Sequence, residues 1–173
     1  SSGVLYEKTK SCQKNTVLVR NAGEFEHFAK ASLPESTSEF AHKKPVIGYY
    51  GAIAEWLDVS ALELAAKRHP EWSFVLIGDV SDAKVKVLDD FRNVHFLGEK
   101  SYQELPAYLS SFDVCVIPFL RNRLTEATNP VKLYEYFAAK KPVVARRLPE
   151  TEHFSSCAWL YDSAEEFCSS LEQ

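Results

Sequence analysis

Residues 45–80, PVIGYYGAIAEWLDVSALELAAKRHPEWSFVLIGDV, decide the fold class of this chain. Two continuous apolar runs, residues 46–50 and 73–77, flank a segment with helical periodicity. Apolar strands without polar alternation are typical of a parallel sheet that is covered on both faces. The stretch therefore predicts a strand–helix–strand unit.

The helix between these strands has its own signals. Ser60 and Glu63 have the spacing of a capping box at a helix start. His69-Pro70 predicts the helix end, because proline disfavours a helical conformation in the residue before it. The apolar stripe that faces the sheet comprises Leu57, Ala61, Leu64 and Ala65.

The same alternation continues along the chain. Three more apolar runs predict strands over residues 94–97, 114–117 and 142–145, and a helix is expected around residues 102–110. This order favours an α/β, Rossmann-like, doubly wound parallel sheet with right-handed crossovers and helices on both faces.

The two ends of the chain are less regular. Residues 16–20 are expected to form a strand, whereas residues 33–44 have the Pro, Ser, Thr and charge content of a linker. A short strand over residues 158–160 and a final helix from about Ser163 complete the prediction.

Glycine follows three of the predicted strands, at Gly51, Gly78 and Gly98, and Pro118 follows a fourth. Ligands of open α/β sheets bind beyond the carboxyl ends of the strands. Any one glycine is explained by a tight turn, but four such strand ends on one edge favour a ligand crevice there.

A second informative stretch is residues 125–145, TEATNPVKLYEYFAAKKPVVA. Asn129 is a good N-cap and Pro130 is favoured at the first helical position. Lys132 and Glu135 then lie on one face of the first helical turns. A helix start suits phosphate, and a carboxylate one turn along suits sugar hydroxyls, so the stretch favours a nucleotide-sugar site.

Charge is unevenly distributed. The chain carries 20 basic and 24 acidic residues, a net charge of -4, which argues against a nucleic-acid binder. Residues 121–147 nevertheless hold seven basic and two acidic residues. That local excess is either a solvated basic face or a field for a phosphorylated small molecule.

Several classes of protein are disfavoured. Cysteines lack CxxC spacing and histidines lack metal-ligand spacing, so we expect a reduced, cytoplasmic protein without a metal site. No membrane span or signal peptide is recognised. The absence of Met and the Ser1-Ser2-Gly3 start suggest a fragment or processed chain.

Three segments together resemble the donor-binding C-terminal domain of GT-B glycosyltransferases, in the retaining group 1, family 4. They are residues 45–80, NVHFLGEKSYQELPAYLSSFDVCVIPF and TNPVKLYEYFAAKKPVVA. LVRNAGEFEHF is similar to the segment by which that family leaves its N-terminal domain. The resemblance implies that residues 1–44 are a remnant of, and linker from, an N-terminal acceptor domain, and that residues 45–173 bind a nucleotide sugar.

The resemblance also implies roles for individual residues. Glu135 matches the second glutamate of the family's Glu-x7-Glu motif, which holds the ribose hydroxyls; otherwise it is a surface partner of Lys132. Glu126 is the candidate first, catalytic glutamate, although it lies nine residues before Glu135 rather than eight. Backbone amides in the loop between them are expected to cradle the diphosphate, at Thr128, Asn129, Pro130 and Val131.

One departure from the family concerns the loop after the first strand, residues 51–58, which contains no Arg or Lys. Family members commonly neutralise the donor diphosphate there, so Arg121, Arg123 and Lys132 are the expected substitutes. The base-binding position of the family matches Gly98, Glu99 and Lys100, and Gly51 lies where backbone approaches the ligand.

The resemblance implies a hexosyltransferase that transfers sugar from a UDP- or GDP-sugar donor to a glycan or lipid-linked acceptor, without a cofactor, in cell-surface polysaccharide biosynthesis. A catalytic histidine and the acceptor site belong to the missing domain, so this fragment alone is expected to be inactive. The location is cytoplasmic, and the inner face of the membrane is compatible with it. Two alternatives stay open: a GT-B-type nucleotide-sugar epimerase, and a non-catalytic interaction module.

Overall fold

The computed structural model describes residues 1–30 and 44–173. In this part of the chain six parallel strands form one sheet in the order β3-β2-β1-β4-β5-β6. The strands are β1 (Val46–Tyr50), β2 (Ser73–Ile77), β3 (Val94–Phe96), β4 (Val114–Ile117), β5 (Val143–Arg146) and β6 (Trp159–Tyr161). All six coincide with predicted strands to within one residue at each end, which confirms the doubly wound α/β fold.

The strand order creates one switch point. The chain moves outward from β1 to β2 and β3, then returns to place β4 on the other side of β1, where Ile47 pairs with Val114. In sheets of this kind the crevice for a ligand opens at the carboxyl ends of the two strands that flank the switch. Here these are β1 and β4.

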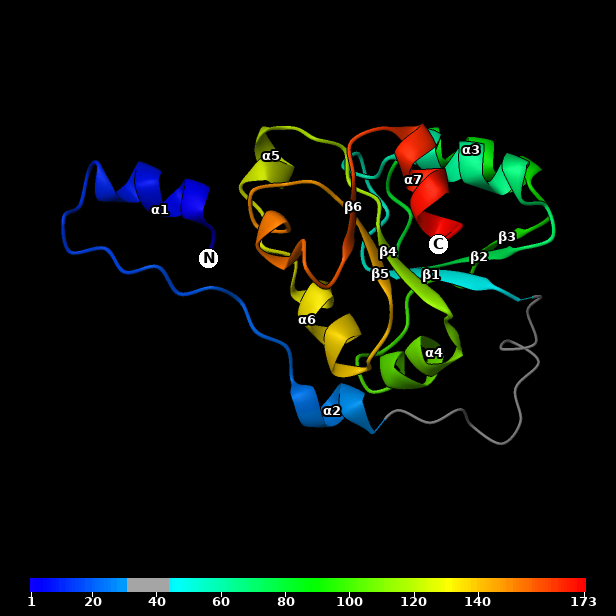
Figure 1. Ribbon diagram of the computed structural model, residues 1–173, viewed down its shortest axis with the longest axis horizontal. Helices are drawn as coiled ribbons and strands as arrows, with labels where there is room; N and C mark the ends of the chain where they lie inside the picture. The colour runs from blue at the N-terminus through cyan, green and yellow to red at the C-terminus, as the bar shows by residue number, and fades with distance from the viewer. Residues whose placement is uncertain (31–43) are drawn as a thin grey trace.

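Helices cover both faces of the sheet (Figure 1). The helix α3 (Val59–Arg68) packs against α7 (Ala164–Leu171) on one face, with η2 (Ala83–Asp90) beside α3. The other face carries α4 (Leu105–Ser111), α6 (Val131–Ala138) and α2 (Phe25–Ala29), which packs on α6. The remaining short elements are α1 (Gly3–Lys10), α5 (Arg123–Glu126) and η3 (Glu152–Phe154).

The core explains the continuous apolar runs of the sequence. Every residue of β1 and β2 is buried, because helices cover both faces. Gly48 lies where the Phe112 ring packs onto β1: a Cβ atom added there would be 2.0 Å from the ring. Close packing of α4 on the sheet therefore requires glycine at this position.

Two helix starts differ from the prediction. The N-cap of α3 is Asp58, whose Oδ1 accepts from the Ala61 N–H at 3.1 Å, so the expected Ser60–Glu63 capping box is wrong. The N-cap of α6 is Pro130 and the helix begins at Val131. Local propensity located both starts but missed the cap, because several adjacent residues can cap a helix.

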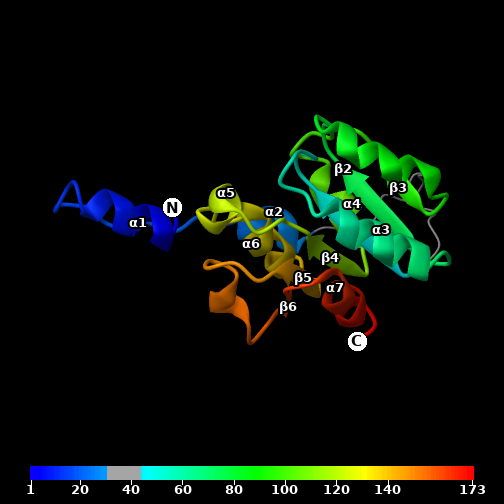
Figure 2. The ribbon, with the colours of Figure 1, turned by 90° about the horizontal axis from the view of Figure 1, so that it is seen from above.

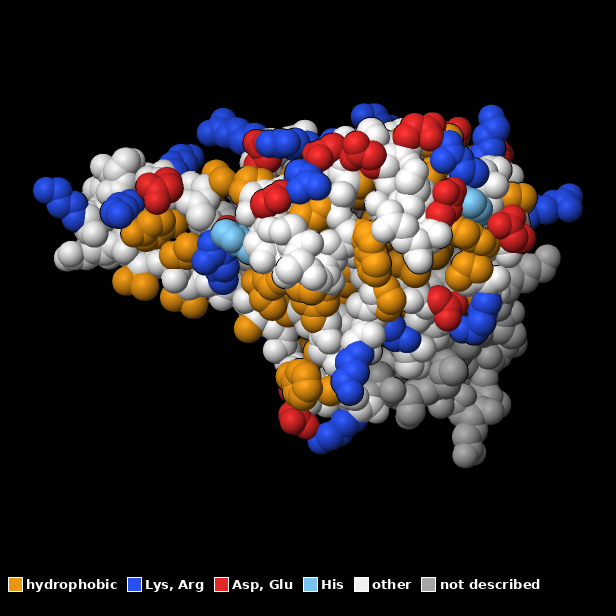
Figure 3. Space-filling model, viewed as in Figure 1, with side chains coloured by type: hydrophobic (Ala, Val, Ile, Leu, Met, Phe, Trp, Pro, Cys, Tyr) orange, Lys and Arg blue, Asp and Glu red, His pale blue; other side chains and the backbone are white. Residues whose placement is uncertain are grey.

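The N-terminal arm, residues 1–24, was predicted least well. Residues 16–20 form no strand, since no strand in residues 1–30 and 44–173 pairs with them, and the helix α1 was not expected. The arm projects from one end of the molecule (Figure 2) and carries apolar side chains on its surface (Figure 3), with Val17 82% and Val19 74% exposed. The predicted linker lies, except for Lys44, outside the described residues.

Candidate nucleotide-sugar site

Three glycines shape the carboxyl edge of the sheet. Gly51, Gly78 and Gly98 follow β1, β2 and β3 with φ of 128°, 148° and 67°. The Gly51 N–H donates to Ile77 O at 2.8 Å, and the Gly78 N–H donates to Gly98 O at 2.9 Å. A Cβ atom on Gly78 would be 2.1 Å from Gly51 O. The three loops are thus held together at one edge, as the sequence predicted.

The loops after β1 and β4 are joined across the switch point. The Asp58 N–H donates to Pro118 O at 2.7 Å, and the Leu120 N–H donates to Trp56 O at 2.7 Å. These bonds place the aromatic side chains of both loops beside the end of β1.

Two hollows open at this edge. The aromatic hollow, about 360 Å³, is lined by Tyr49, Ala52, Trp56, Phe119, Leu124, Thr125, Thr128 and Lys132. The glycine hollow, about 150 Å³, is lined by Tyr50, Gly51, Ala52, Ile77, Gly78, Asp79, Glu99, Lys100 and Leu105. A larger hollow of about 640 Å³ lies at the opposite edge, beside Pro70, Ser73 and Asn93, where the strands begin. We place the candidate site at the carboxyl edge, because some of the predicted ligand residues line its hollows: Gly51, Glu99, Lys100, Thr128 and Lys132.

Lys132 is the cation that lines the aromatic hollow. Its Nζ lies 5.0 Å from the ring centroid of Tyr49 and 5.1 Å from that of Phe119. Among the described residues it has no hydrogen-bond or ion-pair partner, and it approaches Gly51 so closely that a Cβ there would be 2.9 Å from Nζ. Burial lowers the pKa of Lys132 to about 8, although the charge of Glu135 opposes this. A half-buried ammonium without an anion is suited to bind one.

Glu135 lies one turn further along α6 and is 6% exposed. The Tyr50 hydroxyl donates to its Oε2 at 2.7 Å. Burial raises the pKa of Glu135, while the Tyr50 hydrogen bond and the charges of Lys132 and His27 oppose that rise. The structure therefore brings Lys132 and Glu135 to the same edge from one helix.

Glu126 and Arg123 of α5, and Arg121 just before that helix, do not join Lys132 at the hollows. The Arg121 Nε donates to Glu126 Oε1 at 2.9 Å, with both side chains substantially exposed. Arg123 is exposed as well. None of the three is among the residues that line the two hollows.

The loop before α6 uses its polar groups internally. The Thr128 N–H donates to Thr125 O at 3.0 Å, and proline at position 130 has no N–H to offer. Asn129 is 3% exposed, and its Nδ2 donates to Glu150 Oε2 at 2.8 Å and to Tyr134 Oη at 3.2 Å. The expected cradle of amides is therefore reduced to the N–H groups of Asn129 and Val131.

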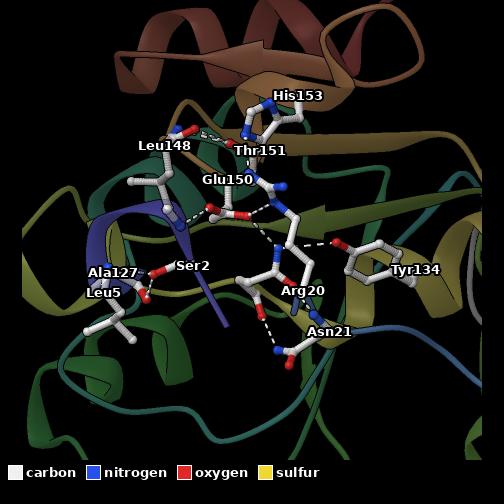
Figure 4. A network of polar contacts seen from close by, with 12 residues as sticks. Ser2, Leu5, Arg20, Asn21, Ala127, Tyr134, Leu148, Glu150, Thr151 and His153 are labelled. Carbon is white, nitrogen blue, oxygen red and sulfur yellow. Dashed lines mark hydrogen bonds and ion pairs between the residues drawn. The ribbon is translucent and has the colours of Figure 1, made fainter. Parts of the chain in front are cut away.

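The sequence did not predict Glu150, the hydrogen-bond partner of Asn129. Glu150 is 1% exposed and accepts from three donors: Gly3 N at 2.6 Å, Arg20 Nε at 2.8 Å and Asn129 Nδ2 (Figure 4). Asn21 adds a bond from its Nδ2 to Asn129 O at 2.7 Å. Burial alone raises a carboxyl pKa, but these donors together lower that of Glu150. This hydrogen-bond network holds the N-terminal arm against the loop before α6. No local sequence motif predicts these contacts.

The Rossmann-like parallel sheet has the fold of a GT-B glycosyltransferase domain. Residues 44–173 match the family glycosyl transferases group 1, and the chain belongs to this family. It is 32% identical over 137 residues to TuaH of Bacillus subtilis (strain 168), which is named as a teichuronic acid biosynthesis glycosyltransferase; the match covers 77% of this chain and 34% of TuaH.

Solved structures show the same fold. An OtsA apo structure aligns with a TM-score of 0.66 and 15% identity, over 87% of this chain and 41% of that one. HepE of Anabaena in complex with UDP and glucose aligns with a TM-score of 0.57 and 18% identity, over 75% of this chain and 38% of that one. The chain thus spans about a third to two-fifths of the length of these proteins.

Proposed function

We propose that this chain is the donor-binding, C-terminal half of a retaining, family 4 glycosyltransferase, and that its carboxyl edge binds a nucleotide-diphosphate sugar. The nucleotide would lie across the switch point, with the diphosphate beside Lys132 and the ribose against Glu135. The name of the HepE complex, with UDP and glucose, supports UDP ahead of GDP as the nucleotide.

The observation that carries this proposal is the position of Lys132. The loop after β1, residues 51–58, has no basic residue, yet Lys132 Nζ lies against Gly51 at the start of that loop. A cation there stabilises negative charge on the diphosphate leaving group as the bond to the sugar breaks. The Lys132 ammonium lies against the rings of Tyr49 and Phe119, where little water competes for it. Its charge therefore attracts an anion more strongly than it would in bulk water.

Other residues take secondary roles. The Gly98, Glu99 and Lys100 loop borders the glycine hollow, where the base would bind. For Glu126 to contact the donor sugar as the catalytic glutamate, its ion pair with Arg121 would have to open. Arg123, the first residue of α5, and Arg121, which precedes this helix, would also have to move to meet the diphosphate.

The whole enzyme would transfer the sugar to a glycan or lipid-linked acceptor in polysaccharide biosynthesis, which the name of TuaH supports. The acceptor site and catalytic histidine would lie in an N-terminal domain, and no metal or other cofactor is required in the proposed reaction. We place this enzyme in the cytoplasm or at the inner membrane face. No helix within residues 1–30 and 44–173 has both the length and the apolar character needed to cross a bilayer.

Calorimetric titration of the full-length protein with UDP, GDP and ADP tests the proposal. We expect UDP to bind, and Lys132→Met and Glu135→Gln each to weaken it. Lys140→Met is the matched control, because Lys140 is exposed just beyond the other end of α6. Absence of nucleotide binding at millimolar concentration would instead support the non-catalytic interaction module.

A further inference from the structure

Tyr50 is the last residue of β1 and is 4% exposed. Its hydroxyl donates to Oε2 of Glu135 at 2.7 Å, between two buried residues that lie 85 positions apart. The backbone of Tyr50 is also held, since its N–H donates to the Tyr136 hydroxyl at 3.3 Å. Tyr50 also pairs with Ile77 of β2, so the donor of this hydrogen bond is positioned by the sheet rather than by a loop.

This contact leaves the two carboxylate oxygens of Glu135 unlike each other. An ionised carboxylate accepts several hydrogen bonds, and Oε2 already has its donor in Tyr50. Oε1 has no hydrogen-bond donor among the described residues of the chain. The vicinal diol of ribose can then donate to Oε1, because the Tyr50 hydrogen bond to Oε2 already orients the carboxylate.

We propose that Tyr50 is a positioning residue, whose hydrogen bond orients Glu135 so that the carboxylate accepts from the ribose hydroxyls of the nucleotide. This inference rests on the proposed function, because it assigns Glu135 to the ribose.

Other titratable groups also face Glu135. They come from α6 itself, from α2 and from the turn after β3, and are Lys132, Tyr136, His27 and Tyr102. The Tyr50 hydrogen bond lowers the pKa of Glu135 against the larger effect of burial, as do the charges of Lys132 and His27. Removing the Tyr50 hydroxyl should therefore raise this pKa and leave the other groups in place.

The experiment measures the affinity of the full-length protein for UDP and for 2′,3′-dideoxy-UDP as a function of pH. The ratio of the two affinities cancels phosphate ionisation, which both ligands share, and isolates the ribose hydroxyls. In the wild type this ratio falls as the pH drops through the pKa of Glu135. In Tyr50→Phe we expect the fall to occur about one to two pH units higher, from the strength of a hydrogen bond to a charged group.

Two further variants make the test specific. Tyr136→Phe removes the hydroxyl that accepts from the Tyr50 N–H but makes no hydrogen bond to Glu135. Because Tyr50 stays paired with Ile77 in the sheet, this variant should cost stability but leave the pH of the fall unchanged. Glu135→Gln should abolish the fall, with or without Tyr50→Phe, which assigns the titration to Glu135 rather than to His27.

The results with Glu135→Gln and Tyr50→Phe distinguish failure of the Tyr50 role from failure of the proposed function. If Glu135→Gln lowers the ratio but Tyr50→Phe leaves the pH profile in its wild-type position, the positioning role is refuted and the proposed function stands. If Glu135→Gln leaves the ratio unchanged, the ribose assignment fails and the role of Tyr50 fails with it.

Discussion

Replacing Lys132 with methionine should make the free protein more stable and its nucleotide binding weaker. Lys132 is a half-buried ammonium against two aromatic rings, and it makes no ion pair with the described residues. Its pKa of about 8 against an ordinary 10.5 corresponds to a penalty of about 3 kcal/mol, since one pKa unit equals about 1.4 kcal/mol. Methionine has a similar unbranched shape and carries no charge, so it removes this penalty.

The pH dependence of this gain has a definite sign. Between about pH 8 and 10.5 the unfolded chain holds the Lys132 proton while the folded chain releases it, so wild-type stability rises with pH in that window. The advantage of Lys132→Met is therefore complete below about pH 8 and disappears towards pH 10.5. Urea unfolding of both proteins at about pH 7 and 10 measures it, and a Tm rise of about 2–4 °C per kcal/mol should accompany it.

Binding should change in the opposite direction. A hydrogen bond to a charged group contributes about 1.5–3 kcal/mol, so loss of the ammonium should weaken UDP about 10- to 150-fold. Calorimetry on wild type, Lys132→Met and the control Lys140→Met provides the comparison. A variant that is less stable than wild type at pH 7, or that binds UDP equally well, would refute the reasoning.

Four other results are expected. UDP affinity should fall as the pH rises above about 8, because Lys132 loses the proton that the diphosphate requires, and calorimetry across pH measures this. Glu150→Gln should lower the free energy of unfolding, measured with urea at pH 7, by about 2 kcal/mol. The difference from wild type should shrink as the pH falls through the lowered pKa of Glu150, because the wild-type side chain then loses its charge. Gly48→Ala should destabilise by about 1–3 kcal/mol through overpacking, visible as a lower Tm. Asp58→Ala should cost about 1 kcal/mol or more, and Ser60→Ala clearly less, if Asp58 is the N-cap of α3.

Much of the fold could be predicted because its signals are local. The run of residues 46–50 has no polar alternation, as a strand buried on both faces requires. The failures occurred where the deciding contact is not local. Residues 16–20 have strand-forming side chains, but no strand of the described part of the chain lies beside them, and pairing is a property of the sheet rather than of the segment.

The site divides in the same way. Sequence reasoning located Glu135 and Lys132 from a helix start and a family pattern. It predicted that Asn129 caps a helix and binds the ligand, whereas the Asn129 side chain donates to Glu150, a residue 21 positions further along. Such a contact requires the loops before α6 and after β5 to meet, and neither loop encodes the other.

The sequence by itself determined the order of strands and helices and the glycines at the strand ends, because backbone sterics and apolar periodicity act over a few residues. Only the tertiary structure decided which of the available cations reaches the switch point. Arg121 is held by Glu126 on the surface, while Lys132 is carried by α6 to the rings of Tyr49 and Phe119. The position of a charge in space depends on how distant elements pack, and packing is settled only when the whole sheet has formed.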